Sequence, residues 1–146
     1  MKLSTRSRYG TRLMIRLGLH DGSDPVMLKD IAEGEDISEK YLSQIIIPLK
    51  ASGLVRSFRG AHGGYILAKA PLQISVGDIV TAIEGNIDLV GETKSARGSS
   101  KGSVSVTKKL WDEVSDKIAE TLNSVTLEDL INKCRREKDS ALMYNI

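Results

Sequence analysis

The chain of 146 residues contains a single cysteine, Cys134, and only two histidines. One cysteine excludes an internal disulfide, so a reducing compartment such as the cytoplasm is expected. Long apolar runs are also lacking, because no segment reaches the roughly 20 apolar residues of a membrane span. The N-terminal segment MKLSTRSRYG carries arginines where a signal peptide needs an apolar run. These absences predict a cytoplasmic protein without a membrane partner.

Residue types that support catalysis are equally scarce. The two histidines, His20 and His62, form no serine, histidine and acid combination at a useful spacing. Three glycines at 60, 63 and 64 fall in a predicted hairpin turn, and not in a phosphate-binding loop between a strand and a helix. The sequence therefore argues against an enzyme, and His62 has no cysteine or aspartate at metal-ligand spacing.

Acidic residues are absent from two stretches of the chain. Residues 2–20 contain no Asp or Glu, and they hold Lys2, Arg6, Arg8, Arg12 and Arg16. Residues 40–77 also lack acids, and their basic residues are Lys40, Lys50, Arg56, Arg59 and Lys69. A net charge of only +2 therefore hides two basic segments, which suit a phosphate backbone because cations displace its counterions. The alternative is a solvated face that happens to lack carboxylates.

Two short helices joined by a turn are predicted between residues 27 and 53. The first covers Met27–Glu33, the turn is Gly34–Asp36, and Ser38 is a suitable N-cap for the second helix. The buried stripe of the second helix follows the spacing i, i+3, i+4, i+7 and consists of Leu42, Ile45, Ile46 and Leu49. Pro48 should kink or end this helix early, at a cost of about 3 kcal/mol, with Gly53 as the stop.

A β-hairpin follows, with Arg59 and His62 in its glycine-rich turn. A helix, a strand, a basic turn and a second strand in this order are typical of a winged helix-turn-helix. That fold places one helix in the DNA major groove and a basic loop on the flanking backbone. A first helix within residues 1–20, capped by Ser4 or Thr5, and a helix over Ser75–Glu84 complete the predicted domain.

The C-terminal third is predicted as a loop and two helices. Gly91–Ser105 is rich in glycine and serine and has no periodicity, so it is predicted as a loop. The helix Thr107–Asn123 carries an apolar face made of Leu110, Trp111, Val114, Ile118 and Leu122. Thr126 and Asp129 should cap a last helix, in which Cys134 completes the buried stripe. An amphipathic helix outside a small core needs a partner, either its copy in a second subunit or its own domain.

Several segments resemble the Rrf-type winged-helix regulators: MKLSTRSRYGTRLM, SEKYLSQIIIPLKASGLVRSFRGAHGGY, DIVTAIEG and TLEDL. That family includes the iron–sulfur cluster regulator, the nitric-oxide-sensing repressor and the cysteine-metabolism repressor. The resemblance implies a homodimer on a palindromic double-stranded DNA operator, with the long C-terminal helix as the dimer seam. The expected fold is mainly α with a small β-wing. Residues 1–87 would bind DNA, 88–106 would form a sensor-type loop, and 107–146 would hold the dimerisation helix and C-terminal helix.

The resemblance also suggests which residues contact DNA. By position it implies that Lys40, Tyr41, Ser43 and Gln44 enter the groove, while Arg59 reaches the minor groove or the backbone. We add Ser38, Lys50, His62, Lys2 and Arg8 as further expected contacts. Ser43 replaces a glutamate common in the family, and because a hydroxyl is less selective than a carboxylate, the base preference there should be weak or different.

The predicted loop lacks the three cysteines with which many relatives bind an iron–sulfur cluster. By position, the ligand slots fall on Glu92 or a neighbour, Ser99 and Ser105. A serine hydroxyl is not ionised at neutral pH, so no cluster is expected. A [2Fe-2S] or [4Fe-4S] cluster would require that Ser99 and Ser105 replace native cysteines.

Two origins stay open for this loop: serines introduced in place of cysteines, or a natural cluster-free branch. The sequence predicts a regulator of iron–sulfur, cysteine or redox and nitrosative-stress genes. The alternative function is a winged-helix protein-interaction module without a specific operator.

Overall fold

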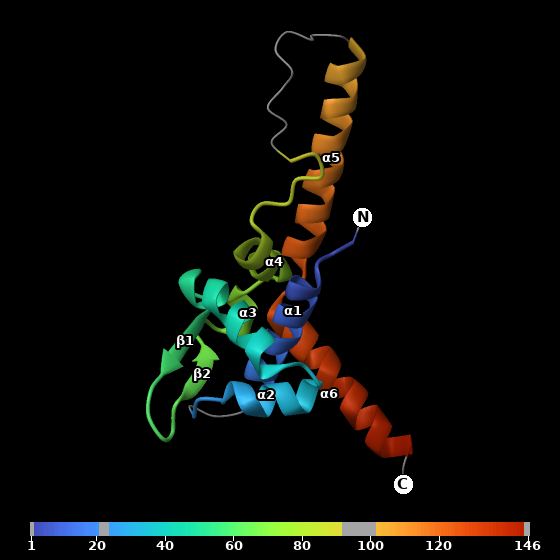
Figure 1. The fold of residues 1–146 in the computed structure, drawn as a ribbon. Helices are drawn as coiled ribbons and strands as arrows, with labels where there is room; N and C mark the ends of the chain where they lie inside the picture. Colours follow the sequence, from blue (N-terminus) through green and yellow to red (C-terminus); the bar gives the residue numbers. More distant parts are fainter. Residues whose placement is uncertain (1, 21–23, 92–101, 145–146) are drawn as a thin grey trace.

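The computed structural model describes residues 2–20, 24–91 and 102–144 (Figure 1). Its elements are α1 (Thr5–Leu19), α2 (Leu28–Glu35), α3 (Glu39–Ala51), β1 (Val55–Phe58), β2 (Gly64–Leu67), the short 3-10 helix η1 (Pro71–Gln73), α4 (Val76–Glu84), α5 (Gly102–Ser124) and α6 (Leu127–Tyr144). The predicted class, mainly α with a small β-wing and a long C-terminal helix, is confirmed. Within the described ranges, no helix has the combined length and apolarity that a bilayer crossing requires.

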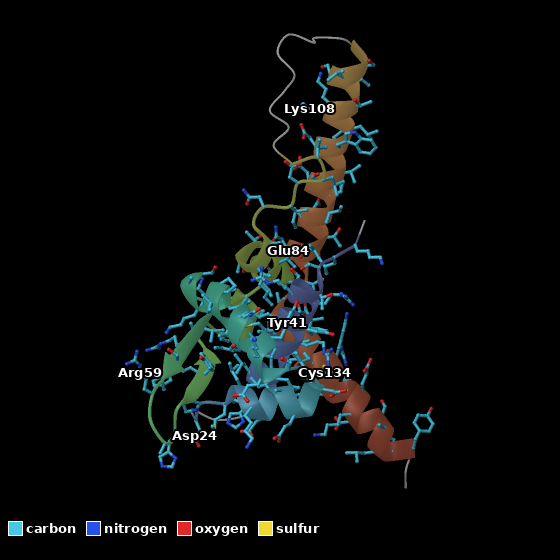
Figure 2. All side chains as sticks on the ribbon, viewed as in Figure 1. Asp24, Tyr41, Arg59, Glu84, Lys108 and Cys134 are labelled. Atoms are coloured by element: carbon cyan, nitrogen blue, oxygen red, sulfur yellow. The ribbon has the colours of Figure 1, made fainter. Side chains whose placement is uncertain are left out.

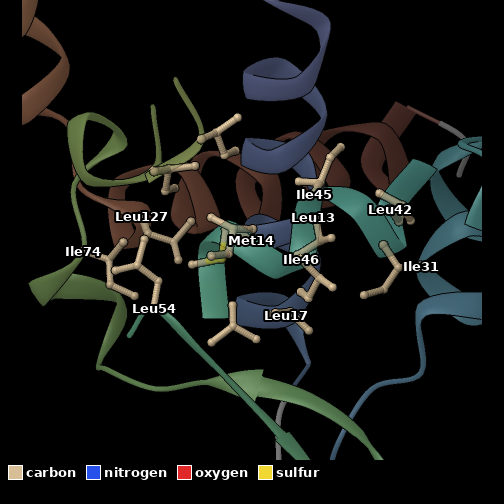
Figure 3. Close-up of a cluster of buried hydrophobic side chains, with 14 of the residues drawn as sticks. Leu13, Met14, Leu17, Ile31, Leu42, Ile45, Ile46, Leu54, Ile74 and Leu127 are labelled. Atoms are coloured by element: carbon tan, nitrogen blue, oxygen red, sulfur yellow. The ribbon is translucent and has the colours of Figure 1, made fainter. Parts of the chain in front are cut away.

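The hydrophobic core lies where α1, α3 and α4 meet, and it is closed by α2 and α6 (Figure 3). Leu13 and Met14 of α1 are fully buried, as are Leu42 and Ile45 of α3. The fit between α1 and α4 is close, because a Cβ at Gly10 would clash with Cδ1 of Ile83. The predicted apolar stripe of α3 therefore fixes the orientation of this helix, with its opposite face directed to solvent.

The helix-turn-helix is formed by α2 and α3, with a shorter turn than predicted. Helix α2 continues to Glu35, and Asp36 adopts the left-handed conformation at φ 53°, with its N–H donating to the carbonyl of Ala32. Ile37 is buried beside the predicted N-cap Ser38. Pro48 does not end α3, which continues to Ala51. The predicted early end is therefore wrong. Pro48 deprives only the Gln44 carbonyl of its N–H partner, and because Gln44 lies on the exposed side of the helix, water can replace that partner.

The wing is an antiparallel pair in which Val55 lies opposite Leu67 and Phe58 opposite Gly64. It is tied to the segment before α2, because Val26 N–H donates to the Tyr65 carbonyl at 2.9 Å. The Tyr65 N–H donates in return to the Val26 carbonyl at 2.8 Å. The wing is therefore held against the helix-turn-helix by two backbone hydrogen bonds.

Helix α5 begins earlier than predicted and rises away from the winged core (Figure 1). It starts at Gly102, so the predicted loop Gly91–Ser105 is wrong over its last four residues, and residues 92–101 lie outside the described ranges. Helix α6 packs back onto α1 and η1, burying Leu127 and Ile131. The predicted cap of α6 is confirmed: the Thr126 hydroxyl accepts from Asp129 N–H, and an Asp129 carboxylate oxygen accepts from Thr126 N–H, both at 3.0 Å.

Candidate nucleic-acid interface

The outward face of α3 is polar near its N-terminus. Lys40, Ser43 and Gln44 are all exposed, and they lie opposite the buried stripe. The first turns of a recognition helix lie closest to the base edges in a docked helix-turn-helix, and the three residues lie in the first two turns of α3. Lys50 is also exposed, but it lies in the last turn of α3.

Two serines of this face already form hydrogen bonds within the helix. The Ser38 hydroxyl accepts from the Tyr41 N–H at 3.0 Å, which makes Ser38 the N-cap of α3. The Ser43 hydroxyl donates to the Lys40 carbonyl at 2.6 Å. A base contact by Ser43 would therefore require its hydroxyl to rotate away from this carbonyl or to accept from the DNA.

Tyr41 lies between the interface and the core. It is half-buried (Figure 2). Its ring meets the ring of Tyr9 edge to face, with centroids 5.6 Å apart. The guanidinium of Arg12 lies 5.3 Å from the Tyr9 ring centroid. Tyr41 therefore links α3 to α1 through an aromatic contact, and its position gives it a packing role in addition to the predicted DNA contact.

The wing turn carries two exposed side chains. Arg59 lies at the outer edge of the hairpin (Figure 2), and His62 is exposed in the same turn. The turn closes through the Gly63 N–H, which donates to the Gly60 carbonyl at 2.9 Å. A Cβ at Gly63 would lie 2.5 Å from the Phe58 carbonyl oxygen, so this turn excludes larger residues there. Arg59 is therefore presented by a tightly closed loop.

The basic stretch of α1 is partly neutralised by an acid from another helix. Arg12 lies 3.4 Å and Arg16 3.8 Å from carboxylate oxygens of Glu35 at the end of α2. The absence of acids from residues 2–20 therefore does not leave all their charges unpaired. Arg8 is exposed and donates to the Thr5 hydroxyl at 3.0 Å.

Lys2 is not grouped with the recognition helix. It lines a groove formed by the end of α4, the segment after it and α5, together with Ile118 and Leu122. The predicted contact residues of α3 and of the wing therefore lie in the helix-turn-helix and hairpin, whereas Lys2 lies beside the long helix α5.

One residue of the α3 outer face was not among the predicted contacts. Ile47 is 65% exposed, more than any other large apolar side chain of α3. Its position four residues after Ser43 and three after Gln44 could have indicated this, because residues at these spacings share a helix face.

The long helix α5 leaves apolar side chains without cover in the described chain. Leu110 and Trp111 are 47% and 44% exposed, and the other predicted seam residues, Val114, Ile118 and Leu122, are half-buried. The lower half of α5 packs on α4, and above that contact the Leu89 N–H donates to the Ser115 hydroxyl at 3.1 Å. The upper half projects beyond the winged core (Figure 1).

The donor atoms do not fit an iron–sulfur cluster. Ser105 lies in the first turn of α5, while Glu92 and Ser99 fall outside the described residues. Cys134 is half-buried on α6, beside a pocket that His20 and Lys138 also line. In the described ranges, no three His, Cys, Asp or Glu side chains come together as a metal site would require. A single thiol in the chain falls short of the thiolates that such clusters need.

The N-terminus of α1 is held by Glu84 of α4. A carboxylate oxygen of Glu84 accepts from the Ser4 N–H at 3.2 Å. Partial burial raises the pKa of Glu84, but hydrogen bonding from Ser4, the nearby Ser7 hydroxyl and the charge of Arg6 together outweigh it, so the pKa lies below its ordinary value. The Glu84 carboxylate therefore connects the end of α4 to the N-terminus of α1, away from the wing (Figure 2).

The sequence matches a family of transcriptional regulators over most of its length. A family model described as "Rrf2: Iron-dependent Transcriptional regulator" matches residues 3–133. The HTH-type transcriptional regulator CymR of Bacillus subtilis (strain 168) is 39% identical over 144 residues, which cover 99% of each chain. The HTH-type transcriptional regulator IscR of Pectobacterium carotovorum subsp. carotovorum (strain PC1) is 37% identical over 132 residues, 90% of this chain and 80% of that protein.

Solved structures of similar proteins share the fold. The structure of CymR (YrzC), described as the global cysteine regulator of B. subtilis, has a TM-score of 0.75 at 40% identity, covering 91% of this chain and 98% of that one. T. potens IscR has a TM-score of 0.74 at 44% identity, covering 92% of this chain and 88% of that one.

Proposed function

This chain belongs to the Rrf2 family of transcriptional regulators, and from that premise we propose that it works as a homodimer that reads a palindromic DNA operator. As a member of this family it is a DNA-binding regulator and not an enzyme. The observation that carries the proposal is the polar outer face of α3, presented beside a wing that carries Arg59.

In the proposed complex α3 lies in the major groove. Gln44 can pair with both N6 and N7 of adenine, and Ser43 tolerates more than one base. Lys40 and Lys50, at the two ends of the exposed face, would neutralise phosphates on either side. Arg59 would extend from the wing toward the minor groove or the flanking backbone, and His62 would lie beside it.

The dimer seam would be formed by α5. Its exposed Leu110 and Trp111 supply apolar surface that the described part of the same chain does not cover. A two-fold axis through two such helices would place two copies of α3 on two equivalent half-sites, which is why a palindromic operator is expected. The groove lined by Lys2, Ile118 and Leu122 lies beside this seam.

We infer that the regulated genes concern cysteine and sulfur supply and that the chain works without a cluster. The match to CymR of B. subtilis covers both proteins almost completely, and that protein is described as a global cysteine regulator. A single cysteine also argues against regulation of this chain by a bound cluster, which needs several thiolate ligands. A partner protein or a small thiol metabolite would then supply the signal.

Selection of genomic fragments tests this function directly. Fragments bound by the protein as it stands are sequenced after washing at low and moderate salt, and the mass in solution is measured by light scattering. Enrichment of one palindrome next to cysteine or sulfur genes, with a mass of two chains, is the expected result. A matched Ser43→Ala, Gln44→Ala double variant should bind DNA without selecting that palindrome.

Three other outcomes would contradict parts of the proposal. Sequence-blind binding alone would contradict a specific operator, and no binding would favour a protein-interaction module. A mass of one chain would contradict the homodimer.

A further inference from the structure

Ile47 is an exposed apolar residue in the middle of a polar helix face. Its side chain is 65% exposed, whereas the four residues of the buried α3 stripe are at most 4% exposed. Ile47 follows Ser43 by four residues and Gln44 by three, so the three side chains lie on one surface of α3. It lies outside the core cluster of this chain, and its exposure to water is unfavourable.

The chemistry of the major groove limits what Ile47 can contact there. Base edges in this groove present hydrogen-bond donors and acceptors, and the one apolar group among them is the C5-methyl of thymine. Isoleucine is branched at Cβ and stiff in a helix, so its contact surface is already ordered before DNA binds. Apolar area buried against a methyl group stabilises a complex, whereas no polar base edge offers isoleucine a partner.

We infer that Ile47 is a specificity-determining residue that reads a thymine methyl in each half-site. The inference rests on the proposed docking of α3 in the major groove. Four residues of helix span about 6 Å, and base pairs stack about 3.4 Å apart. The thymine should therefore lie within about two base pairs of the position that Ser43 faces, and the operator should prefer thymine there.

Removal of single methyl groups from the operator tests this reading. Each thymine of the selected palindrome is replaced in turn, in both half-sites, by deoxyuridine, which differs only by the C5-methyl. Binding is followed by fluorescence anisotropy at one fixed salt concentration, with the wild-type chain and with Ile47→Ala. For the wild type we expect one thymine per half-site at which deoxyuridine lowers affinity about three- to fivefold, the size of one buried methyl.

Variants of α3 distinguish the loss of a methyl contact from a general loss of DNA affinity or of folding stability. Ile47→Ala should distinguish thymine from deoxyuridine at that position far less than the wild type does, because only Cβ of the contacting group remains. Ile47→Val, which keeps the branched carbon, should retain most of the methyl effect. Gln44→Ala is the matched control on the same face, and it should weaken binding while leaving the methyl effect intact. Because Ile47 is exposed, Ile47→Ala should melt at the wild-type temperature.

Two results would overturn the inference in distinguishable ways. An operator whose methyl effects are the same for the wild type and Ile47→Ala would contradict the role of Ile47 alone. The absence of any selected operator would contradict the proposed function, and this inference with it.

Discussion

The contact between the wing and the segment before α2 predicts a large effect for Gly64→Ala. Gly64 has a φ of +149°, and a Cβ there would lie 2.5 Å from the Val26 carbonyl oxygen. That oxygen accepts the Tyr65 N–H, and the Val26 N–H donates to Tyr65 in return. An alanine can therefore be accommodated only if the wing moves away from Val26 and weakens both hydrogen bonds.

Two contributions set the loss of stability in Gly64→Ala: the backbone strain at positive φ and the two weakened hydrogen bonds. A non-glycine residue in a sparsely populated backbone region costs about 1–3 kcal/mol, and each backbone hydrogen bond contributes about 0.5–1.5 kcal/mol. Gly60→Ala is the matched control, because Gly60 also has positive φ, at +105°, but its Cβ would meet no atom of the described chain within 4 Å. The free energy of unfolding should therefore fall by about 1–3 kcal/mol more in Gly64→Ala than in Gly60→Ala.

Thermal unfolding followed by circular dichroism measures this difference. For a chain of this size, about 1 kcal/mol corresponds to roughly 2–4 °C, so Gly64→Ala should melt about 2–12 °C below Gly60→Ala. Operator affinity of Gly64→Ala, measured well below its melting temperature, should also fall because Arg59 moves with the wing. Equal melting temperatures for the two variants would refute the reasoning, since the contact with Val26 would then contribute nothing.

Three further predictions concern DNA, assembly and pH. Arg59→Ala should weaken operator binding by about 1–3 kcal/mol and lower the slope of log affinity against log salt by about 0.9, whereas Lys108→Ala on α5 should change neither in anisotropy titrations. Trp111→Asp should convert two-chain particles to single chains in light scattering, because it charges the proposed seam, while Glu113→Ala should not. Glu84→Gln should be less stable than the wild type at pH 7 in urea titrations. This difference should disappear as the pH falls from 4.5, the ordinary pKa of a glutamate, through the lower pKa that Glu84 has in the folded state. A difference that persists in acid would show that the charge of Glu84 is not the cause.

Features set by neighbouring residues could be predicted from the sequence. The N-caps Ser38 and Thr126 and the stripe of α3 depend on hydrogen bonds or spacings within about one or two turns, and all were placed correctly. The hairpin also follows from its glycines. The turn before α3 was less predictable, because Asp36 and not Gly34 adopts the left-handed conformation.

Features that depend on distant segments could not be predicted in this way. Glu35 approaches Arg12 and Arg16 only because α2 packs across α1, so the charge pattern of residues 2–20 overstated their availability for DNA. The position of Lys2 beside α5 also depends on distant segments, because the groove that it lines is formed by residues between Val80 and Leu122.

The packing of α4 links the two proposed interfaces. Helix α4 contacts α1, α3 and α5. Its contact with α5 is close, because a Cβ at Gly77 would clash with Oδ1 of Asn123. In the proposed dimer, the distance between the two copies of α3 would therefore depend on how α4 sits on α5 and α6 on α1, and not on the side chains that read bases. If the chain binds as this dimer, different residues would set the spacing between half-sites and the sequence within each half-site. A change at Gly77 should then alter the preferred spacing while leaving the preferred bases unchanged.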